Sequence, residues 1–303
     1  MKVLLLVPMA DGLTGPAIKY GFEQLGHIVK AVDPRVQPME WIFPIACEFK
    51  PDLVFCSRED ILAEPVRKIK QRMKIVACTW NVDTRPNMDY WKNLFPLVRA
   101  CDYYFVMDTR FIPEWRKINQ NTFWLPEGLQ IENHDKPKMI TEEDRMKYSC
   151  DVCWIGGRTS WVHEFREAYL NAVERMGVNF KQWGCSGNPQ IRNEEHDKAV
   201  ALSKINLAMS AFPLNGKSTS QRNYLILGAG GFLLELDREK LFEIFPSNIL
   251  DTYTTPQDLV KKIEYWLDHG KERRKYAKRG YEWVRKNATF KHRVQMALSY
   301  MGI

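Results

Sequence analysis

The sequence contains no apolar stretch long enough to cross a membrane. Its longest apolar run lies near residues 3–10 of 303 and stops at Asp11, whereas a membrane helix needs about 20 such residues. The run also has no cleavage site and no extended apolar segment, so we expect no secretory leader and a cytoplasmic protein. The hydrophobic fraction of 45% and charged fraction of 27% exclude a disordered or fibrous chain.

Motifs for several common ligand sites are also missing. The chain has neither the Gly-x-Gly-x-x-Gly fingerprint nor the spacing of a Walker phosphate loop. Its seven cysteines are scattered and odd in number, as is typical of a reducing compartment. Cys150 and Cys153 form one close pair, but zinc would need two further ligands, and their apolar surroundings favour a buried strand. We therefore predict no metal site and disfavour a dinucleotide-dependent oxidoreductase.

Positive charge is concentrated in two segments. The formal charge is +7, yet residues 1–270 sum to −1, because residues 271–303 contain ten basic and two acidic side chains. A second basic stretch lies at residues 67–74. Such stretches can bind a polyanion such as a nucleic acid backbone. Because they are more often solvated helix faces, charge alone assigns no function.

Short apolar runs alternate with longer amphipathic stretches throughout the chain, which predicts parallel sheets covered by helices on both faces. A polar stretch at residues 127–147 separates two such series, so we predict two doubly wound α/β domains. Strands are expected at residues 2–8, 28–33, 52–57, 74–80, 102–107, 122–125, 150–156, 178–183, 203–210 and 230–236. Helices are expected at 14–26, 38–50, 59–73, 88–101, 111–119, 160–176, 221–227, 256–269, 271–286 and 290–300.

Each predicted domain has a glycine-containing loop directly after its first strand. In this fold class ligands lie beyond the carboxyl ends of the strands, so both loops are candidates. The first spans residues 8–16 and contains Gly12; its alternative is a plain turn. The second contains Gly156, Gly157 and Arg158 and is the better phosphate candidate, because paired glycines let backbone amides approach an anion. Its alternative is a strained turn with a solvated arginine.

A third loop, at residues 215–222, is rich in hydroxyl groups and leads into a short apolar helix. Ser218, Thr219 and Ser220 precede the helix, and Arg222 lies in its first turn. Hydroxyl and amide donors at a helix N-terminus, together with a fixed cation, suit a diphosphate without a metal. Serine and threonine before a helix are also ordinary caps.

The ordered set of short motifs in this chain resembles the CgeB-like glycosyltransferases. The C-terminal part of the resemblance rests on Tyr253-Thr-Thr-Pro-Gln-Asp-Leu259 and Ala288-Thr-Phe-Lys-His-Arg293. The donor-site part rests on residues 203–207, 220–224 and 230–234. Similar pieces in the first half lie at residues 22–27, 50–54, 80–83 and 124–128. Each motif is weak alone, but together they cover most of the chain.

This resemblance implies a GT-B fold, in which two Rossmann-like domains with doubly wound parallel sheets face each other across a cleft. Residues 1–130 would form the acceptor-side domain, with a last helix at about 288–303 packing back on it. Residues 131–287 would bind the nucleotide-sugar donor. The implied reaction is metal-independent hexosyl or pentosyl transfer from a nucleoside-diphosphate sugar, most often a UDP-sugar, to a hydroxyl, without a cofactor. The absence of an Asp-x-Asp motif agrees with metal independence.

The resemblance also assigns roles to individual residues. An inverting enzyme needs a base, for which Asp83 is the first choice and Asp11 the second, both after predicted strand ends. Gly12, Trp80 and Asp108 are the acceptor-side candidates, Asp108 also being the third candidate base. The donor-binding candidates are Gly156, Gly157, Arg158, Trp183, Lys204, Ser218, Thr219, Ser220, Arg222 and Asn223.

One position departs from the family pattern. Where the family has Arg-x-Phe-Glu, with the glutamate expected to hold the ribose hydroxyls, this chain has Arg222, Asn223, Tyr224 and Leu225. Leucine accepts no hydrogen bond, so Asn223 is a candidate substitute.

Three readings of the function therefore remain open. The first is a glycosyltransferase whose acceptor is a small molecule, a polymer or DNA carrying hydroxymethylated bases. The second is a non-catalytic nucleotide- or sugar-binding protein, and the third is another enzyme of this build, such as a sugar-nucleotide epimerase.

Overall fold

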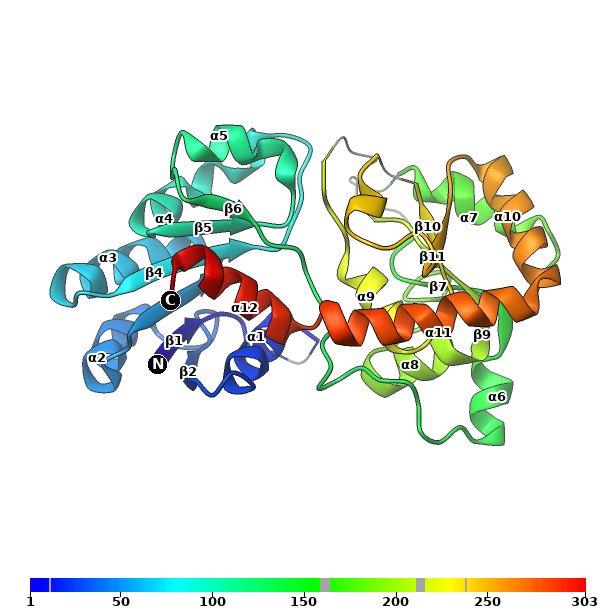
Figure 1. Ribbon diagram of the computed structural model, residues 1–303, viewed down its shortest axis with the longest axis horizontal. Coiled ribbons are helices and arrows are strands. Elements are labelled where there is room, and N and C mark those ends of the chain that lie inside the picture. The colour runs from blue at the N-terminus through cyan, green and yellow to red at the C-terminus, as the bar shows by residue number, and fades with distance from the viewer. Residues whose placement is uncertain (11, 159–163, 211–215, 238) are drawn as a thin grey trace. The chain divides into compact units, whose positions relative to one another are not determined.

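The computed structural model describes residues 1–303 except 11, 159–163, 211–215 and 238 (Figure 1). The chain divides into two compact units, which we describe separately. Unit 1 contains Met1–Glu127 together with Phe290–Ile303, and unit 2 contains Gly128–Thr289. The last segment of the chain therefore belongs to the same unit as the first.

Unit 1 is built on a six-stranded parallel sheet in the order β2-β1-β3-β4-β5-β6. Its strands are β1 Lys2–Leu6, β2 Ile28–Val32, β3 Leu53–Ser57, β4 Val76–Asn81, β5 Tyr103–Val106 and β6 Thr122–Trp124. Consecutive residues Leu4 and Leu5 on the central strand β1 point to opposite faces, and both are fully buried. Both faces of the sheet are therefore covered, which explains why its strands are nearly continuous apolar runs.

Helices of unit 1 cover the two faces of this sheet. They are α1 Thr14–Glu23, α2 Met39–Phe49, α3 Ala63–Arg72, α4 Phe95–Ala100, α5 Ile112–Arg116 and α12 Phe290–Met301. Single 3₁₀ turns precede α3 and α5, at Asp60–Leu62 and Thr109–Phe111. A longer 3₁₀ segment, Met88–Leu94, precedes α4. Helices α1 and α12 cover one face, where Phe22 and Phe290 pack with Phe55 and Trp80. Helices α2, α3 and α4 cover the other face.

Helix α12 lies directly against α1 (Figure 1). A Cβ atom on Gly21 of α1 would lie 2.9 Å from the carbonyl oxygen of Phe290, so only glycine allows this approach. The side chain of Arg293 donates from Nε to the carbonyl oxygen of Glu127 at 2.7 Å. The close backbone contact at Gly21 and the buried hydrogen bond of Arg293 hold α12 against the rest of unit 1.

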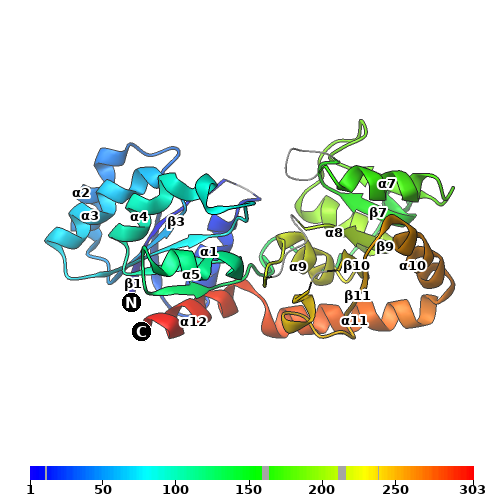
Figure 2. The same ribbon diagram turned by 90° about the horizontal axis from the view of Figure 1, so that it is seen from above.

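Unit 2 is built on a five-stranded parallel sheet in the order β11-β10-β9-β7-β8. Its strands are β7 Cys150–Ile155, β8 Phe180–Trp183, β9 Ser203–Ala208, β10 Leu233–Leu236 and β11 Leu250–Tyr253. Its helices are α6 Glu142–Tyr148, α7 Arg166–Glu174, α8 Asn193–Leu202, α9 Gln221–Gly228, α10 Pro256–Asp268 and α11 Gly270–Asn287, with a 3₁₀ turn at Leu241–Glu243. Helices α7 and α10 pack on one face. On the other face α9 packs with α8 and with the long helix α11 (Figure 2).

The predicted fold class, two doubly wound parallel sheets, is confirmed, and each of the ten predicted strands is present. The sequence-based prediction missed β11 and the helices α6 and α8. Helix α7 begins at Arg166. The predicted start of this helix, residue 160, lies outside the described residues. Among the residues that the structure describes, no helix is both long enough and apolar enough to span a membrane.

Candidate functional site

The carboxyl ends of β7, β9 and β10 lie side by side at one edge of the unit 2 sheet. Three segments leave or enter this edge: the loop after β7, the loop after β9 and the N-terminus of α9. In doubly wound folds this edge is where ligands bind.

Arg222, in the first turn of α9, lies across the end of β7. Its Nε donates to the carbonyl oxygen of Ile155 at 2.9 Å, and its guanidinium stacks on the indole of Trp154 with a centroid distance of 4.6 Å. Burial lowers the pKa of this guanidinium, while the nearby Glu235 and Tyr253 raise it. Its two terminal nitrogens donate to no oxygen of the described residues, so they remain available to an anion.

A second guanidinium, that of Arg166 at the start of α7, lies 5.2 Å from the centre of the same indole ring. It donates to the carbonyl oxygens of Met209 at 2.7 Å and Gly157 at 3.4 Å, which are the residues that follow β9 and β7. Two cations therefore lie at this edge of the sheet. Arg166 was not predicted from the sequence. The feature that could have identified it is an arginine about ten residues after the paired glycines.

Gly156 is required by the position of Arg222. Its φ of +145° is unfavourable for other residues, and a Cβ atom there would lie 2.5 Å from Nη2 of Arg222. Its N–H donates to Trp183 and its carbonyl accepts from the Trp154 indole at 2.9 Å. The close approach observed at this glycine is that of the Arg222 side chain, whereas the predicted approach was that of an anion.

Asn223, the predicted substitute for the ribose-binding glutamate, is fully buried and makes three internal hydrogen bonds. Its Oδ1 accepts from the Ser210 hydroxyl at 3.2 Å and the Ser220 N–H at 3.1 Å. Its Nδ2 donates to the carboxylate of Glu235 at 2.5 Å. The amide is therefore used inside unit 2, which contradicts its predicted contact with ribose.

Glu235 is the second residue of this site that sequence reasoning missed. It lies on β10, is fully buried, and accepts from the Ser210 N–H at 3.1 Å as well as from Asn223. A single carboxylate in an otherwise apolar strand, residues 231–236, was the available signal. Its negative charge acts on Arg222 across the site. Leu225, at the family's glutamate position, packs instead into the apolar cluster beneath α9.

The three hydroxyl residues before α9 lie at the same edge. Ser218 and Thr219 are buried, and Ser220 is the N-cap residue of the helix. The Thr219 hydroxyl lies 3.1 Å from the hydroxyl of Tyr224, so it is already used internally. What this loop offers an anion is the helix N-terminus beside Arg222.

Three predicted donor-binding residues are engaged elsewhere in unit 2. Arg158 makes an ion pair with Glu174 at 2.7 Å, and that contact raises the pKa of its guanidinium. Lys204 lies at the opposite, amino-terminal edge of the sheet and pairs with Asp151 at 2.7 Å. Trp183 is buried against Tyr148 and offers no open face for stacking a base. The geometry therefore argues against contact of these residues with the donor.

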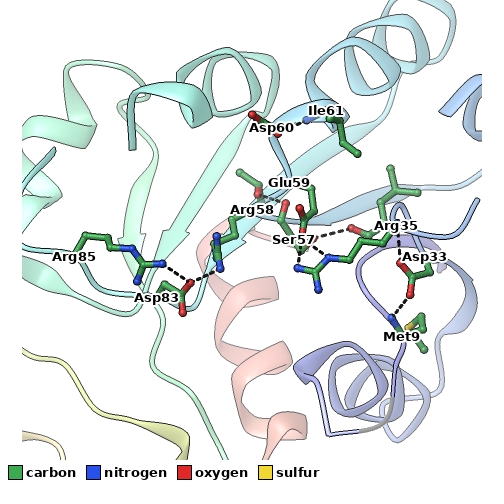
Figure 3. A network of polar contacts seen from close by, with 12 residues as sticks. Met9, Asp33, Arg35, Ser57, Arg58, Glu59, Asp60, Ile61, Asp83 and Arg85 are labelled. Atoms are coloured by element: carbon green, nitrogen blue, oxygen red, sulfur yellow. Dashed lines mark hydrogen bonds and ion pairs between the residues drawn. The ribbon is translucent and has the colours of Figure 1, made fainter. Parts of the chain in front are cut away.

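Unit 1 carries an acidic side chain between two arginines at the carboxyl end of β4 (Figure 3). The Oδ2 of Asp83 contacts the guanidinium of Arg58 and lies 3.6 Å from that of Arg85. The Asp83 side chain is 32% exposed. Its Oδ1 accepts no hydrogen bond from the described part of the chain and is free to meet a ligand.

The first loop of unit 1 is fixed from a neighbouring strand. The N–H of Met9 donates to Asp33 Oδ2 at 2.7 Å, just after the end of β2 (Figure 3). Gly12 has a φ of +75°, which explains a glycine at this turn. Asp11, the second candidate base, lies outside the described residues.

The structure contradicts the two remaining acceptor-side predictions. Trp80 is 3% exposed, donates from Nε1 to the carbonyl oxygen of Leu125 at 3.0 Å, and belongs to the core of unit 1. Asp108 is 5% exposed. Both of its oxygens accept from Arg110, and the hydroxyl of Thr84 also donates to it. Neither side chain is accessible to an acceptor.

Several residues of the two basic stretches are used inside the protein. Arg273 is buried and donates to the carbonyl oxygen of Trp266, and Arg285 pairs with Asp135 at 2.8 Å. In the other stretch Lys70 pairs with Asp102 at 2.7 Å. The exposed cations of α11 are Lys271, Arg274, Lys275, Lys278, Arg279 and Lys286.

Comparison with known proteins agrees with this architecture. Residues 158–299, just under half of the chain, match the family described as glycosyl transferase-like. No curated protein matches the chain by sequence.

Solved structures resemble the whole chain at low sequence identity, so they inform on the fold alone. Anabaena Alr3699/HepE in complex with UDP has a TM-score of 0.67 and 12% identity over 100% of both chains. Sucrose-phosphate synthase from Thermosynechococcus elongatus has a TM-score of 0.67 and 11% identity over 99% of this chain and 98% of that one. A putative UDP-N-acetylglucosamine 2-epimerase from Listeria monocytogenes has a TM-score of 0.56 and 10% identity over 91% and 90%. The chain therefore has a GT-B-like fold of two parallel α/β sheets, and its residues 158–299 match the family described as glycosyl transferase-like.

Proposed function

We propose that this chain is a glycosyltransferase that moves a sugar from a nucleoside-diphosphate sugar to an acceptor hydroxyl. The observation that carries the proposal is Arg222, a guanidinium stacked on Trp154 with both terminal nitrogens directed to no oxygen of the described residues. It lies at the N-terminus of α9, where the helix dipole also favours negative charge. A diphosphate is the anion that fits two hydrogen-bond donors at a strand edge.

In this proposal residues 131–287 bind the donor, and UDP is the expected nucleotide because the similar structures include one solved with UDP and one with UDP-glucose. Arg222, Arg166 and the N-terminus of α9 stabilise the negative charge that develops on the departing diphosphate. These groups supply that stabilisation without a metal, so the transfer of a hexose or pentose is proposed to be metal-independent.

The base is assigned to Asp83 in residues 1–130. Its unpartnered Oδ1 can accept the proton of an acceptor hydroxyl, while Arg58 and Arg85 hold the other oxygen in place. Asp11 remains the second candidate. The narrower assignment to the CgeB-like group is likewise part of the proposal, since the family match is to the broader class.

The decisive experiment measures release of UDP from a panel of labelled UDP-sugars. Arg222→Ala should lower turnover by about 10²–10³, the usual cost of one lost donor to a developing oxyanion. Arg175→Ala, which removes an exposed arginine at the end of α7, is the matched control and should retain turnover. Near-normal turnover of Arg222→Ala, with turnover intact in the control, would refute the phosphate assignment.

Measurements of binding, product and stability on the same protein separate the alternatives. UDP binding without any turnover would indicate a non-catalytic binding protein. Conversion of the donor to an epimer would indicate a sugar-nucleotide epimerase. Stabilisation of the chain by NAD(P) but by no nucleoside diphosphate would overturn the donor class itself.

DNA carrying hydroxymethylated bases is proposed as one acceptor. The support is the row of exposed cations on α11. Among the described residues, Lys278 is the member of this row that lies in an ion pair, 3.9 Å from Glu282. A gel shift on duplex DNA over a salt series tests this, because backbone binding weakens steeply with salt. Absence of binding at low salt would remove DNA as the acceptor and leave the donor proposal untouched.

A further inference from the structure

Three buried side chains with metal-binding groups meet in unit 2, away from any role assigned above. His134 lies in the segment that enters the unit, and His196 and Asp197 lie in the first turn of α8. All three are between 3% and 5% exposed. One ligand atom from each lies within 4.8 Å of the others.

The carboxylate of Asp197 is the centre of the cluster. Its Oδ1 lies 2.8 Å from Nδ1 of His134 and 3.0 Å from Nδ1 of His196. The two imidazole rings are nearly perpendicular, with centroids 5.2 Å apart. In tetrahedral zinc sites, bonds of about 2.0–2.1 Å place neighbouring ligand atoms roughly 3.3 Å apart. The two Oδ1–Nδ1 distances therefore need to lengthen by a few tenths of an ångström for these atoms to enclose an ion.

The second oxygen of Asp197 is already fixed from outside the cluster. Its Oδ2 accepts from the N–H of Asp135 at 2.9 Å. Metal-binding carboxylates are typically oriented by such a second hydrogen bond. The side chain of Asp135 is in turn held by two residues of α11, because Tyr281 and Arg285 donate to it at 2.9 and 2.8 Å.

Glu132 supplies an independent observation. Both of its carboxylate oxygens are buried, and neither has a hydrogen-bond partner in the part of the chain that the structure describes. A buried carboxylate without a partner is costly unless a cation lies close by. Glu132 interacts electrostatically with His134, so an ion bound at the cluster would reduce this cost.

We propose that His134, His196 and Asp197 bind a zinc-type divalent transition-metal ion, with the fourth position open to water. Two imidazole nitrogens and a carboxylate oxygen are the ligand set that zinc takes readily. In the bound state each imidazole carries its ring proton on Nε2, so that the Nδ1 lone pair faces the ion. The ion joins the segment entering unit 2 to α8, and its role is structural.

In the alternative, the cluster binds no ion and is held by hydrogen bonds alone. Both imidazoles then donate from Nδ1 to Asp197, and added metal has no effect. The two cases differ in a property that can be measured without knowing the activity of the protein.

The test is titration of the chelator-treated full chain with Zn²⁺ alone, followed by calorimetry and by melting temperature. We expect one ion per chain and a rise in melting temperature. Binding of Co²⁺ at the same stoichiometry should give the intense visible absorption of a tetrahedral complex, a readout that requires no variant. Less than one equivalent of bound Zn²⁺, or no change in melting temperature, overturns the proposal.

Variants identify the ligands. Asp197→Asn and His196→Gln should each weaken Zn²⁺ binding by at least about 10-fold, because even the loss of an outer partner costs this much. His269→Gln is the matched control, because His269 is an exposed histidine of the same unit. Zn²⁺ affinity unchanged in both cluster variants overturns the assignment. A variant that fails to fold leaves the wild-type cobalt spectrum as the deciding result.

Discussion

The guanidinium of Arg222 occupies the space that a side chain at residue 156 would need. Nη2 lies 2.5 Å from the ideal Cβ position of Gly156, far inside normal contact. The two residues are 66 positions apart, on α9 and at the end of β7, and the Nε bond to Ile155 holds them together. The glycine and the arginine therefore act as one unit, and replacing either displaces the proposed phosphate site.

Gly156→Ala should lower both stability and turnover of a UDP-sugar. The strained φ of +145° costs about 1–3 kcal/mol for a residue with a side chain, and the new methyl group must move Arg222. Denaturant unfolding and UDP release measure the two effects. Gly157→Ala is the neighbouring control, because a Cβ atom there meets nothing within 4 Å. Equal losses in the two variants would contradict the close approach of Arg222.

Asp83→Asn should lower sugar transfer by about 10²–10⁴ if Asp83 is the base, the usual contribution of general base catalysis. Binding of UDP should be unchanged, since the donor groups lie in unit 2. Asp89→Asn is the control, because Asp89 is an exposed aspartate that pairs only with Lys92 among the described residues. An unchanged transfer rate in Asp83→Asn moves the role to Asp11 or to no carboxylate.

Asn223→Ala should destabilise unit 2 rather than act on ribose binding alone. It removes the hydrogen bonds that Asn223 makes with the Ser220 N–H, the Ser210 hydroxyl and the carboxylate of Glu235. Each unsatisfied buried group costs about 1–3 kcal/mol, so the free energy of unfolding should fall by several kcal/mol. Asn287→Ala, an exposed amide at the end of α11, should change it by less than about 0.5 kcal/mol. Normal stability with weakened UDP binding would instead restore the ribose role.

The stability of the metal-free chain should fall as the pH is lowered through 6.5. Burial lowers the pKa of His196 below its ordinary value of 6.5, with His134 and Arg222 adding to the effect and Asp197 opposing it. The unfolded chain therefore binds this proton first, which favours unfolding between 6.5 and the folded pKa. Unfolding in denaturant at several pH values measures the slope, which His196→Gln should reduce and His269→Gln should preserve. A slope unaffected by His196→Gln would contradict the assignment.

The architecture was predictable because the chain's apolar pattern is strong where the sheets are. Residues 3–6 of β1, for example, are buried on both faces and form a continuous apolar run. Strand β11 was missed because Asp251 and Thr252 interrupt its four residues, and its burial depends on β10 and α10. Helix α8 was missed because His196 and Asp197 occupy core-facing positions where an apolar residue is expected.

The positions of candidate residues were predictable where they follow from an element: Arg222 lies in the first turn of α9 and Asp83 lies just after β4. The roles of these two residues stay predictions. Trp80 and Asn223 were misjudged because their partners, Leu125 and Glu235, are distant in sequence. Asp108 was misjudged because Arg110 and the distant Thr84 both bind its carboxylate. Lys204 was assigned to the donor site from the family resemblance, although it lies at the start of its strand and therefore at the amino-terminal edge of the sheet.

The return of α12 to unit 1 has a consequence for the order of folding during synthesis. When residues 1–127 have left the ribosome, Phe55 and Trp80 still lack Phe290 and the rest of α12 on their face of the sheet. Unit 2 is a single uninterrupted stretch, so every residue it needs is available before α12 is made. The unit that emerges second can therefore finish folding first, while the first waits with an exposed apolar face, the state in which a nascent chain most needs protection from aggregation.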